Sequence, residues 1–143
     1  MRIQDVLRVK GGQVYTIRPD ATVTELLATL ARLNVGALVV CAEDNSVAGI
    51  VSERDVVRRL NDRGTAVLHA PVSSIMTTTV TTCSEPDYVE DLMRLMTDHH
   101  IRHVPVTRDG QLVGLISIGD VVKNRIGELE HERKNLIGYI AGN

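Results

Sequence analysis

The stretch Val47-Ala48-Gly49-Ile50-Val51-Ser52-Glu53-Arg54-Asp55-Val56-Val57 has a second version, Leu112-Val113-Gly114-Leu115-Ile116-Ser117-Ile118-Gly119-Asp120-Val121-Val122. Glycine, serine, aspartate and the two closing valines recur in the same order, at a shift of 65 residues. Upstream, the apolar positions of residues 23–30 match those of residues 89–96 at a shift of 66, because the turn at 43–46 is one residue longer than its counterpart. An internal repeat therefore sets the architecture of the chain.

Each copy predicts a short strand, a helix, a two-stranded hairpin and a second helix. In the first copy these are a strand at 14–17, a helix at 22–33, a hairpin of 37–42 with 47–52 and a helix at 53–63. In the second copy they are a strand at 80–83, a helix at 88–99, a hairpin of 103–107 with 112–117 and a helix from Gly119 onward. The first helix of each copy has apolar residues at i, i+3, i+4 and i+7. Thr22 followed by Glu25 predicts a capping box. Asp87 followed by Glu90 is a weaker version of the same signal.

The expected fold class is α+β, with two tandem β-α-β-β-α repeats packed about a pseudo-twofold axis. One such unit is too small to be stable alone, so we expect the copies to pack sheet to sheet and leave two related clefts between them. We divide the chain into a first repeat at 1–65, a second repeat at 66–126 and a C-terminal helical tail at 127–143, with residues 65–74 joining the repeats.

Composition argues against several classes of protein. The chain has 16 basic and 18 acidic residues and lacks Trp and Phe, so neither a basic face nor stacking platforms for nucleic acid are expected. No apolar run approaches the ~18 residues of a membrane span. Asp5 lies where a signal peptide would begin its apolar stretch, so we expect a cytoplasmic protein with no membrane association. Cys41 and Cys83 lie in apolar or β-branched runs, which favours buried free thiols over a disulfide or redox switch.

Catalytic and metal-binding patterns are not recognisable. The sequence offers no Ser-His-Asp order with a nucleophile elbow, no Gly-rich phosphate loop and no paired buried acids, so we do not expect an enzyme. His99 and His103 have i, i+4 spacing but span a helix end and a strand start. A metal site needs three or four convergent ligands, so no metal is expected.

Both copies end in Gly-aliphatic-aliphatic-Ser-x-x-Asp-Val-Val, and the second also contains Ile101-Arg102-His103-Val104-Pro105-Val106 after the lead-in Ser74-Ile75-Met76-Thr77. These motifs resemble those of the CBS domain, named for cystathionine β-synthase, over roughly Ile3 to Arg125. The resemblance implies a stand-alone, Bateman-type pair of CBS domains. The first copy departs from the family pattern at Gly36-Ala37 and at Val39.

The repeated Ser-x-x-Asp has two interpretations. Serine with an acid three residues later is an N-terminal helix cap. The same geometry suits a nucleotide, because the helix N-terminus attracts phosphate and an ionised aspartate can accept hydrogen bonds from ribose hydroxyls. The resemblance implies that Asp55 and Asp120 bind ribose, with Ser52 and Ser117 beside them.

The resemblance also implies that each adenine slot draws on both copies. One cleft would combine Tyr15, Thr16, Val35 and Gly36 with Ile116, Ser117 and Asp120; the other would combine Met76, Thr81, Ile101 and Arg102 with Val51, Ser52 and Asp55. Arg54, Arg102 and His103 are candidates for phosphate contacts. For each apolar member the alternative is ordinary core, and for each arginine it is a solvated side chain.

After Asp120 one helix is expected to continue to the end of the chain. Its apolar residues fall at spacings of three and four and are interrupted by Arg133: Val122, Ile126, Leu129, Leu136 and Ile140. This stripe either folds back on its own domain or packs on a second copy. The resemblance implies a homodimer.

The leading hypothesis is therefore a regulatory module that binds an adenine-containing ligand and acts through a separate protein partner. AMP, ADP, ATP, NAD and S-adenosylmethionine are the candidate ligands, none of them a catalytic cofactor. The alternative is a structural or protein-interaction module with non-functional clefts, and an enzyme is the third possibility.

Overall fold

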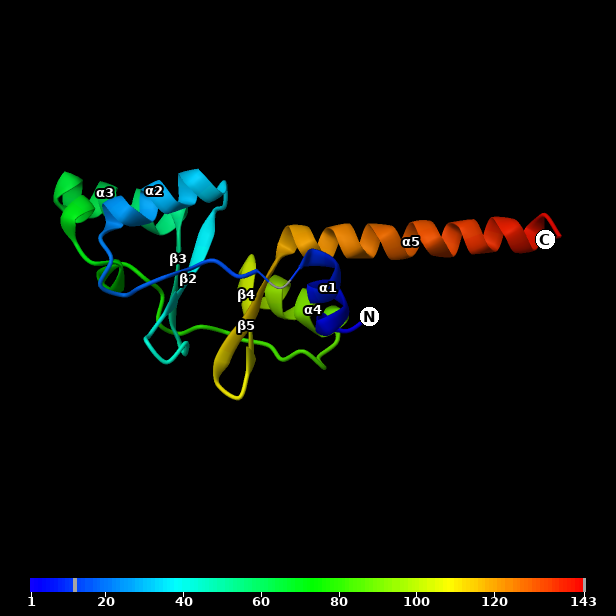
Figure 1. The fold of residues 1–143 in the computed structure, drawn as a ribbon. Helices are drawn as coiled ribbons and strands as arrows, with labels where there is room; N and C mark the ends of the chain where they lie inside the picture. The colour runs from blue at the N-terminus through cyan, green and yellow to red at the C-terminus, as the bar shows by residue number, and fades with distance from the viewer. Residues whose placement is uncertain (12, 143) are drawn as a thin grey trace.

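The structure, a computed structural model, describes residues 1–11 and 13–142. The elements are α1 (Ile3–Lys10), β1 (Thr16–Ile17), α2 (Val23–Leu33), β2 (Ala37–Cys41), β3 (Val47–Ser52), α3 (Glu53–Arg63), the 3-10 helices η1 (Gly64–His69) and η2 (Val72–Ser74), α4 (Val89–His99), β4 (His103–Arg108), β5 (Gln111–Ser117) and α5 (Ile118–Ile140). Two hairpins occupy the middle, with α2 and α3 on one and α1, α4 and the start of α5 on the other (Figure 1). The fold is α+β and consists of two tandem repeats, as predicted.

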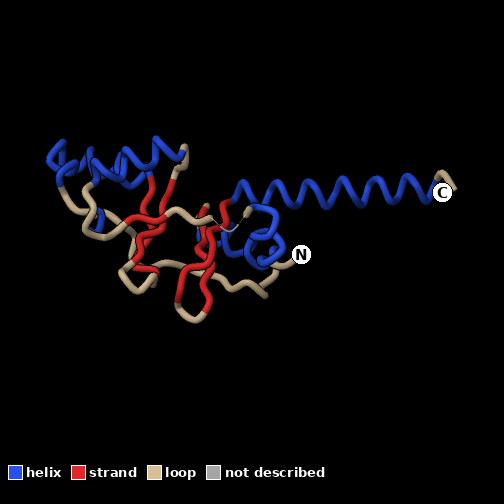
Figure 2. The backbone as a smooth tube through the Cα atoms, viewed as in Figure 1, coloured by secondary structure: helices blue, strands red, loops and turns tan. Residues whose placement is uncertain are grey.

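The two hairpins, β2-β3 and β4-β5, pack against each other. Val39, Cys41 and Leu112 form a small core between them. Asn45 adds polar contacts, because its carbonyl accepts from the Leu112 N–H at 3.2 Å and its side-chain amide donates to the Leu112 carbonyl at 3.1 Å. The expected packing of sheet on sheet is therefore present (Figure 2).

The first strand of the first repeat is shorter than predicted. The prediction of a strand at 80–83 in the second repeat is wrong. In the first repeat Thr16 pairs with Val39 in a parallel ladder. In the second repeat only a single bridge forms, in which the Cys83 N–H donates to the Pro105 carbonyl at 3.0 Å. Pro105 occupies the position of Val39 and has no N–H to donate, so the ladder cannot extend toward residue 80.

For the first long helix of each repeat, the predicted cap forms in the first repeat only. The Glu25 N–H donates to Thr22 Oγ1 at 3.2 Å, and the Thr22 N–H donates to the Glu25 carboxylate at 3.1 Å. The cap predicted at Asp87 is wrong, because α4 begins after Tyr88 without a side-chain cap. Asp87 instead accepts from the Ser84 N–H at 2.8 Å and stabilises the preceding turn.

The two main cores exchange segments of chain. Val67, Val72 and Ile75, from the segment that joins the repeats, lie in the core of the first repeat. Ile3 and Val6, from the N-terminal helix α1, lie in the core of the second. The sequence did not predict helix α1. The helix packs in the core of the second repeat, against residues far from it in the sequence. The division at residues 65 and 126 stays a prediction.

The two lead-in segments make matching backbone hydrogen bonds. They run from Val23 N to Ala70 O (3.0 Å) and from Val72 N to Ala21 O (2.7 Å) in the first repeat, and from Val89 N to Met1 O (3.0 Å) and from Ile3 N to Asp87 O (2.9 Å) in the second. Residues 1–3 thus correspond to residues 70–72 at an offset of 69. The segment that begins the chain is the structural counterpart of the segment between the repeats.

Both cysteines are free and buried, as predicted. Burial raises the pKa of the Cys41 thiol, and the nearby Asp44 carboxylate adds to the effect. Burial, with the nearby Asp87 carboxylate, raises the pKa of the Cys83 thiol to about 12.

The last helix, α5, is continuous over 23 residues, as the sequence predicted. Its first turns pack on α1, β5 and α4, where Val121 is buried, and the remainder projects away from the body as a rod (Figures 1 and 2). Within residues 1–11 and 13–142, no helix has the length and apolar character needed to cross a membrane.

Candidate functional site

The two Ser-x-x-Asp turns have nearly the same geometry. The Ser52 N–H donates to Asp55 Oδ2 at 2.8 Å, and the Asp55 N–H donates to Ser52 Oγ at 3.3 Å. The corresponding distances between Ser117 and Asp120 are 2.9 and 3.2 Å. Both serines therefore cap their helices, as the sequence indicated. Each cap uses Oδ2 of the aspartate, and no described residue hydrogen-bonds Oδ1 of either carboxylate.

A cavity of about 280 Å³ opens beside Asp55 and is lined by both repeats. The first repeat contributes Gly36, Ala37, Ile50, Val51, Ser52, Glu53, Arg54 and Asp55. The rest of the lining consists of Thr77, Thr79, Val80, Thr81, His100, Ile101, Arg102 and His103. The volume lies near the lower end of the roughly 300–1,000 Å³ of small-molecule sites.

The Asp55 cavity combines apolar walls with charged groups. Val51 and Ile101 come from different repeats and line it together. Arg54 and Arg102 also line the cavity and form no ion pair with any residue that the structure describes. The cavity can therefore offer a ligand an apolar contact, an acceptor at Asp55 and two cations.

A second cavity of about 580 Å³ adjoins the first, with Asp55, Thr77 and Thr79 lining both. It extends along α3, where Arg58 and Arg59 line it. Met76, which the sequence assigned to the Asp55 cleft, lines this adjoining cavity instead.

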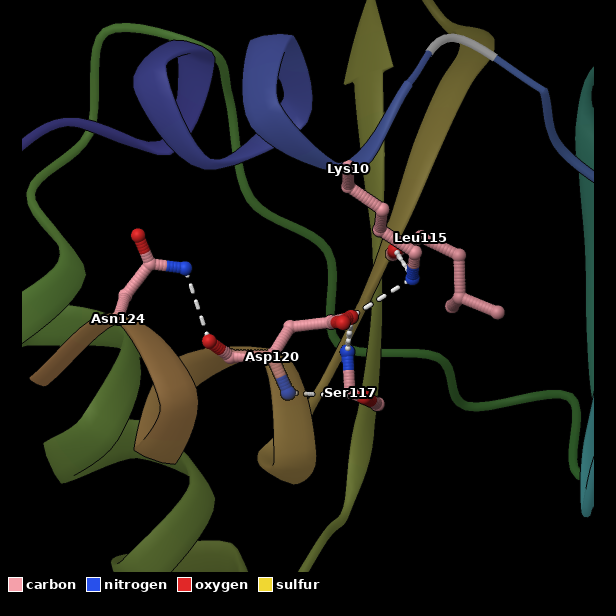
Figure 3. Close-up of polar contacts among 5 residues, drawn as sticks. All are labelled: Lys10, Leu115, Ser117, Asp120 and Asn124. Carbon is pink, nitrogen blue, oxygen red and sulfur yellow. Dashed lines mark hydrogen bonds and ion pairs between the residues drawn. The ribbon is translucent and has the colours of Figure 1, made fainter. Parts of the chain in front are cut away.

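The Asp120 side differs because a lysine occupies it. Lys10 Nζ lies 2.6 Å from Asp120 Oδ2 and donates a second hydrogen bond to the Leu115 carbonyl at 2.7 Å (Figure 3). The Lys10 and Asp120 side chains are only 34% and 24% exposed. Burial by itself would raise the pKa of Asp120, but hydrogen bonds from Lys10 and Ser117 outweigh it and hold the pKa below its ordinary value.

The sequence contained a signal for Lys10 that the interpretation missed. Counted by the offset of 69 that relates the two lead-in segments, the counterpart of Lys10 is Thr79. Leu7 and Met76 correspond by the same count, and each lies directly against an equivalent glycine, Gly114 or Gly49. Threonine carries no charge, so the counterpart position leaves Asp55 without a lysine. Aligning residues 3–10 with residues 72–79 would have revealed the difference.

The structure moves Gly36 from one expected cleft to the other. The sequence assigned Gly36 to the Asp120 cleft, but it lines the Asp55 cavity. The reason is local: Ala37 pairs with Ser52 across β2 and β3, and the Glu53 N–H donates to the Gly36 carbonyl at 3.0 Å. Gly36 therefore lies beside the serine of its own repeat.

The other residues expected around Asp120 have varied positions. Tyr15 and Thr16 are exposed and follow Lys10 along the chain. Val35 packs against the first core, and Ile116 is completely buried in the second. Their role in ligand binding stays a prediction.

His103 lies between the two aspartates. It pairs with Ser117 across β4 and β5 and also lines the Asp55 cavity. Burial lowers the pKa of His103, and the positive charges of Lys10 and Arg102 add to this effect, whereas the Asp120 carboxylate opposes it. The imidazole is therefore held toward its neutral form, in which one ring nitrogen accepts hydrogen bonds.

In the part of the chain that the structure describes, no three His, Cys, Asp or Glu side chains lie close enough together to hold an ion.

The fold and site define a class: a tandem-repeat module whose halves jointly line a cavity. The sequence model of the CBS domain matches residues 4–62 and again residues 72–127. The chain belongs to the CBS domain family and is a CBS-domain pair.

Known members of the family are similar over most of the chain. The crystal structure of the CBS-domain containing protein ATU1752 from Agrobacterium tumefaciens is 42% identical, with a TM-score of 0.84 over 87% of this chain and 99% of that one. The mitochondrial CBS domain-containing protein CBSX3 of Arabidopsis thaliana is 37% identical over 98% of this chain and 72% of its own length. The CBS domain pair of protein MJ0100, in complex with methylthioadenosine and S-adenosyl-L-methionine, shares the fold at 21% identity and a TM-score of 0.76 over 90% of this chain and 98% of that one.

Proposed function

We propose that this protein is a regulatory module that binds an adenine-containing ligand in the Asp55 cavity and does not itself catalyse a reaction. The observation that carries the proposal is the composition of that cavity. Ser52 and Asp55 from the first repeat line one cavity together with Ile101 and Arg102 from the second. A ligand held there contacts both repeats. The relative position of the repeats then depends on the ligand concentration.

Each part of a nucleotide has a matching group. Oδ1 of Asp55 is open to accept from ribose hydroxyls, while Oδ2 keeps the helix cap. Val51 and Ile101 both line the cavity, and because Val51 is completely buried, Ile101 is the side chain that suits an apolar contact with an adenine ring. Arg54 and Arg102, together with the N-terminus of α3, suit phosphate.

The class of ligand is supported by the family. The MJ0100 pair is in complex with two adenosine compounds, methylthioadenosine and S-adenosyl-L-methionine. We extend that class to AMP, ADP, ATP, NAD and S-adenosylmethionine here. In the adjoining cavity Arg59 pairs with Asp62 at 3.8 Å, so Arg58 is the cation there that favours members with additional phosphates.

The Asp120 cleft binds more weakly in this proposal. A ligand that uses Asp120 must first displace Lys10 from a 2.6 Å contact. A charge-assisted hydrogen bond contributes about 1.5–3 kcal/mol, which corresponds to a loss of about tenfold to hundredfold in affinity. One ligand per chain therefore binds first, at Asp55.

The ligand signal passes to a separate protein partner, and the module works as a homodimer in the cytoplasm. The name of the Arabidopsis relative places that protein in the mitochondrion. Cell fractionation distinguishes the two compartments.

Calorimetry with the five candidate ligands tests the proposal. We expect at least one to bind wild-type protein at one site per chain. Asp55→Asn, which can keep the helix cap but loses the charge, should weaken that ligand by about tenfold to hundredfold. Asp98→Asn, an exposed position on α4, is the matched control and should bind like wild type.

Thermal denaturation supplies the opposing outcome, because a ligand that binds only the native state must raise the Tm. If none of the five ligands raises the Tm, the proposal fails and the alternative, a protein-interaction module with non-functional clefts, replaces it. Lys10 at Asp120 already favours that alternative for one of the two clefts.

A further inference from the structure

The projecting part of α5 carries an apolar stripe that no described residue covers. Five side chains at spacings of three, four and seven are between 47% and 75% exposed: Val122, Ile126, Leu129, Leu136 and Ile140. Val121, the buried residue of α5, faces the body from a different side of the helix. The spacing is that of a coiled-coil seam in which a and d positions meet a partner helix.

Charged residues flank the stripe in two blocks of opposite sign. Lys123 and Arg125 lie on either side of it near the body, and Glu130 and Glu132 occupy the same two flanks one heptad later. Flanking positions of this kind set partner choice and orientation in coiled coils. A helix with one basic and one acidic block is complementary to its own reversed copy.

We propose that α5 pairs with α5 of a second copy of this chain as an antiparallel coiled coil. In the register that matches both blocks, Ile126 lies opposite Leu129 of the partner subunit. Lys123 then lies beside Glu130 of the partner subunit, and Arg125 beside Glu132 of the partner subunit. The twofold axis repeats both pairs. The overlap runs from residue 119 to residue 136, about 27 Å.

Arg133 selects this arrangement over a parallel one. It interrupts the apolar stripe at a position where a parallel, in-register pair would place it against the same arginine of the partner subunit. In the antiparallel register it meets Val122 of the partner subunit, and its methylene stem can pack while the guanidinium reaches water. A single polar residue at a seam position is a known determinant of register.

Disulfide cross-linking tests the register. In the double variant Val122→Cys/Arg133→Cys, the new thiol at position 122 lies opposite the new thiol at position 133 of the partner subunit. Mild oxidation should therefore convert most of the protein to covalent dimers. Each single variant should form few, because its two equivalent cysteines lie about 16 Å apart along the antiparallel pair, too far for a disulfide. The native Cys41 and Cys83 are buried, and wild type is the background control.

The outcomes are distinct. Covalent dimers from the single variants at the rate of the double variant would show parallel pairing and overturn the proposal. An absence of covalent dimers from the double variant would overturn it as well. Positions 122 and 133 are both exposed, and circular dichroism verifies that each variant is folded.

Charge reversal tests the partner chemistry. Lys123→Glu/Arg125→Glu, built on the double-cysteine chain, should slow cross-linking on the order of tenfold, because like charges then face each other. Adding Glu130→Lys/Glu132→Lys should restore the rate. Lys134→Glu changes the same charge away from the stripe and should have little effect. A rate that ignores all of these charges, or one that the four-residue swap fails to restore, would contradict self-recognition by α5.

Discussion

The two Ser-x-x-Asp turns share one local structure but differ in accessibility. Their hydrogen bonds agree within 0.1 Å, because each turn is a helix cap determined by residues within four positions of one another. Asp55 nevertheless borders an open cavity, whereas Asp120 holds Lys10 at 2.6 Å. The comparison teaches that a motif fixes its own backbone, while a distant segment decides whether its carboxylate borders a cavity or an ion pair.

The largest expected effect concerns the lead-in segments themselves. Ile3 and Val72 are counterparts, and both are completely buried. Ile3→Ala should lower the free energy of unfolding by about 2–5 kcal/mol although it is the third residue of the chain. Val9→Ala, on the exposed side of the same helix, should change it by less than about 0.5 kcal/mol. Urea denaturation measures both, and equal effects would mean that α1 does not belong to the second core.

The next effect compares the glycines that the lead-in segments cover. A Cβ at Gly49 would lie 2.7 Å from Met76 Sδ and 2.8 Å from the Thr77 carbonyl oxygen. A Cβ at Gly114 would meet only the Leu7 side chain, at 2.5 Å, which can rotate away. Gly49→Ala should therefore cost about 2–3 kcal/mol of stability and Gly114→Ala about 1 kcal/mol. The reverse order in denaturant titrations would contradict this packing.

Exchanging the counterparts Lys10 and Thr79 tests the comparison most directly. Thr79→Lys should weaken ligand binding at Asp55 by about tenfold, because the new side chain would pair with Asp55 as Lys10 pairs with Asp120. Lys10→Thr should add a second binding site per chain of comparable affinity. Calorimetry reads both affinity and stoichiometry, with Lys134→Thr as a remote control. One site per chain in Lys10→Thr would show that something other than the lysine closes the Asp120 cleft.

The smallest expected effect is the pH dependence due to His103. The pKa of His103 is lowered in the folded chain, chiefly by burial. Between the folded and unfolded pKa values, the unfolded chain therefore binds a proton at this group that the folded chain does not bind. Stability from this group is complete above the unfolded value of about 6.5 and is lost as the pH falls below it toward the folded pKa. His103→Gln should reduce the slope of unfolding free energy against pH below about 6.5. A slope identical to that of wild type would contradict the assignment.

Local chemistry made much of this fold predictable. The helices, hairpins and caps at Thr22, Ser52 and Ser117 depend on residues a few positions apart, and the internal repeat fixed their order. The sequence also grouped Ile101 and Arg102 with Val51, and all three line the Asp55 cavity. These features need only near neighbours or the duplication itself.

The errors have non-local causes. The strand expected at 80–83 does not form because its partner strand contains Pro105. The residues 80–83 by themselves carry no sign of this proline. Helix α1 and the contact of Lys10 with Asp120 depend on packing between segments more than 80 residues apart. Gly36 was placed in the wrong cleft because β2 and β3 bring it to its own Ser52.

The exchange of core segments has a consequence for how the chain is made. The first repeat has all its buried core residues once Ile75 has been synthesised. Helix α1 is made long before, yet the backbone groups that hold it, around Asp87 and Val89, emerge more than eighty residues later. The apolar side of this amphipathic helix, Ile3 and Val6, is thus synthesised before the residues that bury it. The second core therefore closes only after segments from both ends of its sequence have been synthesised.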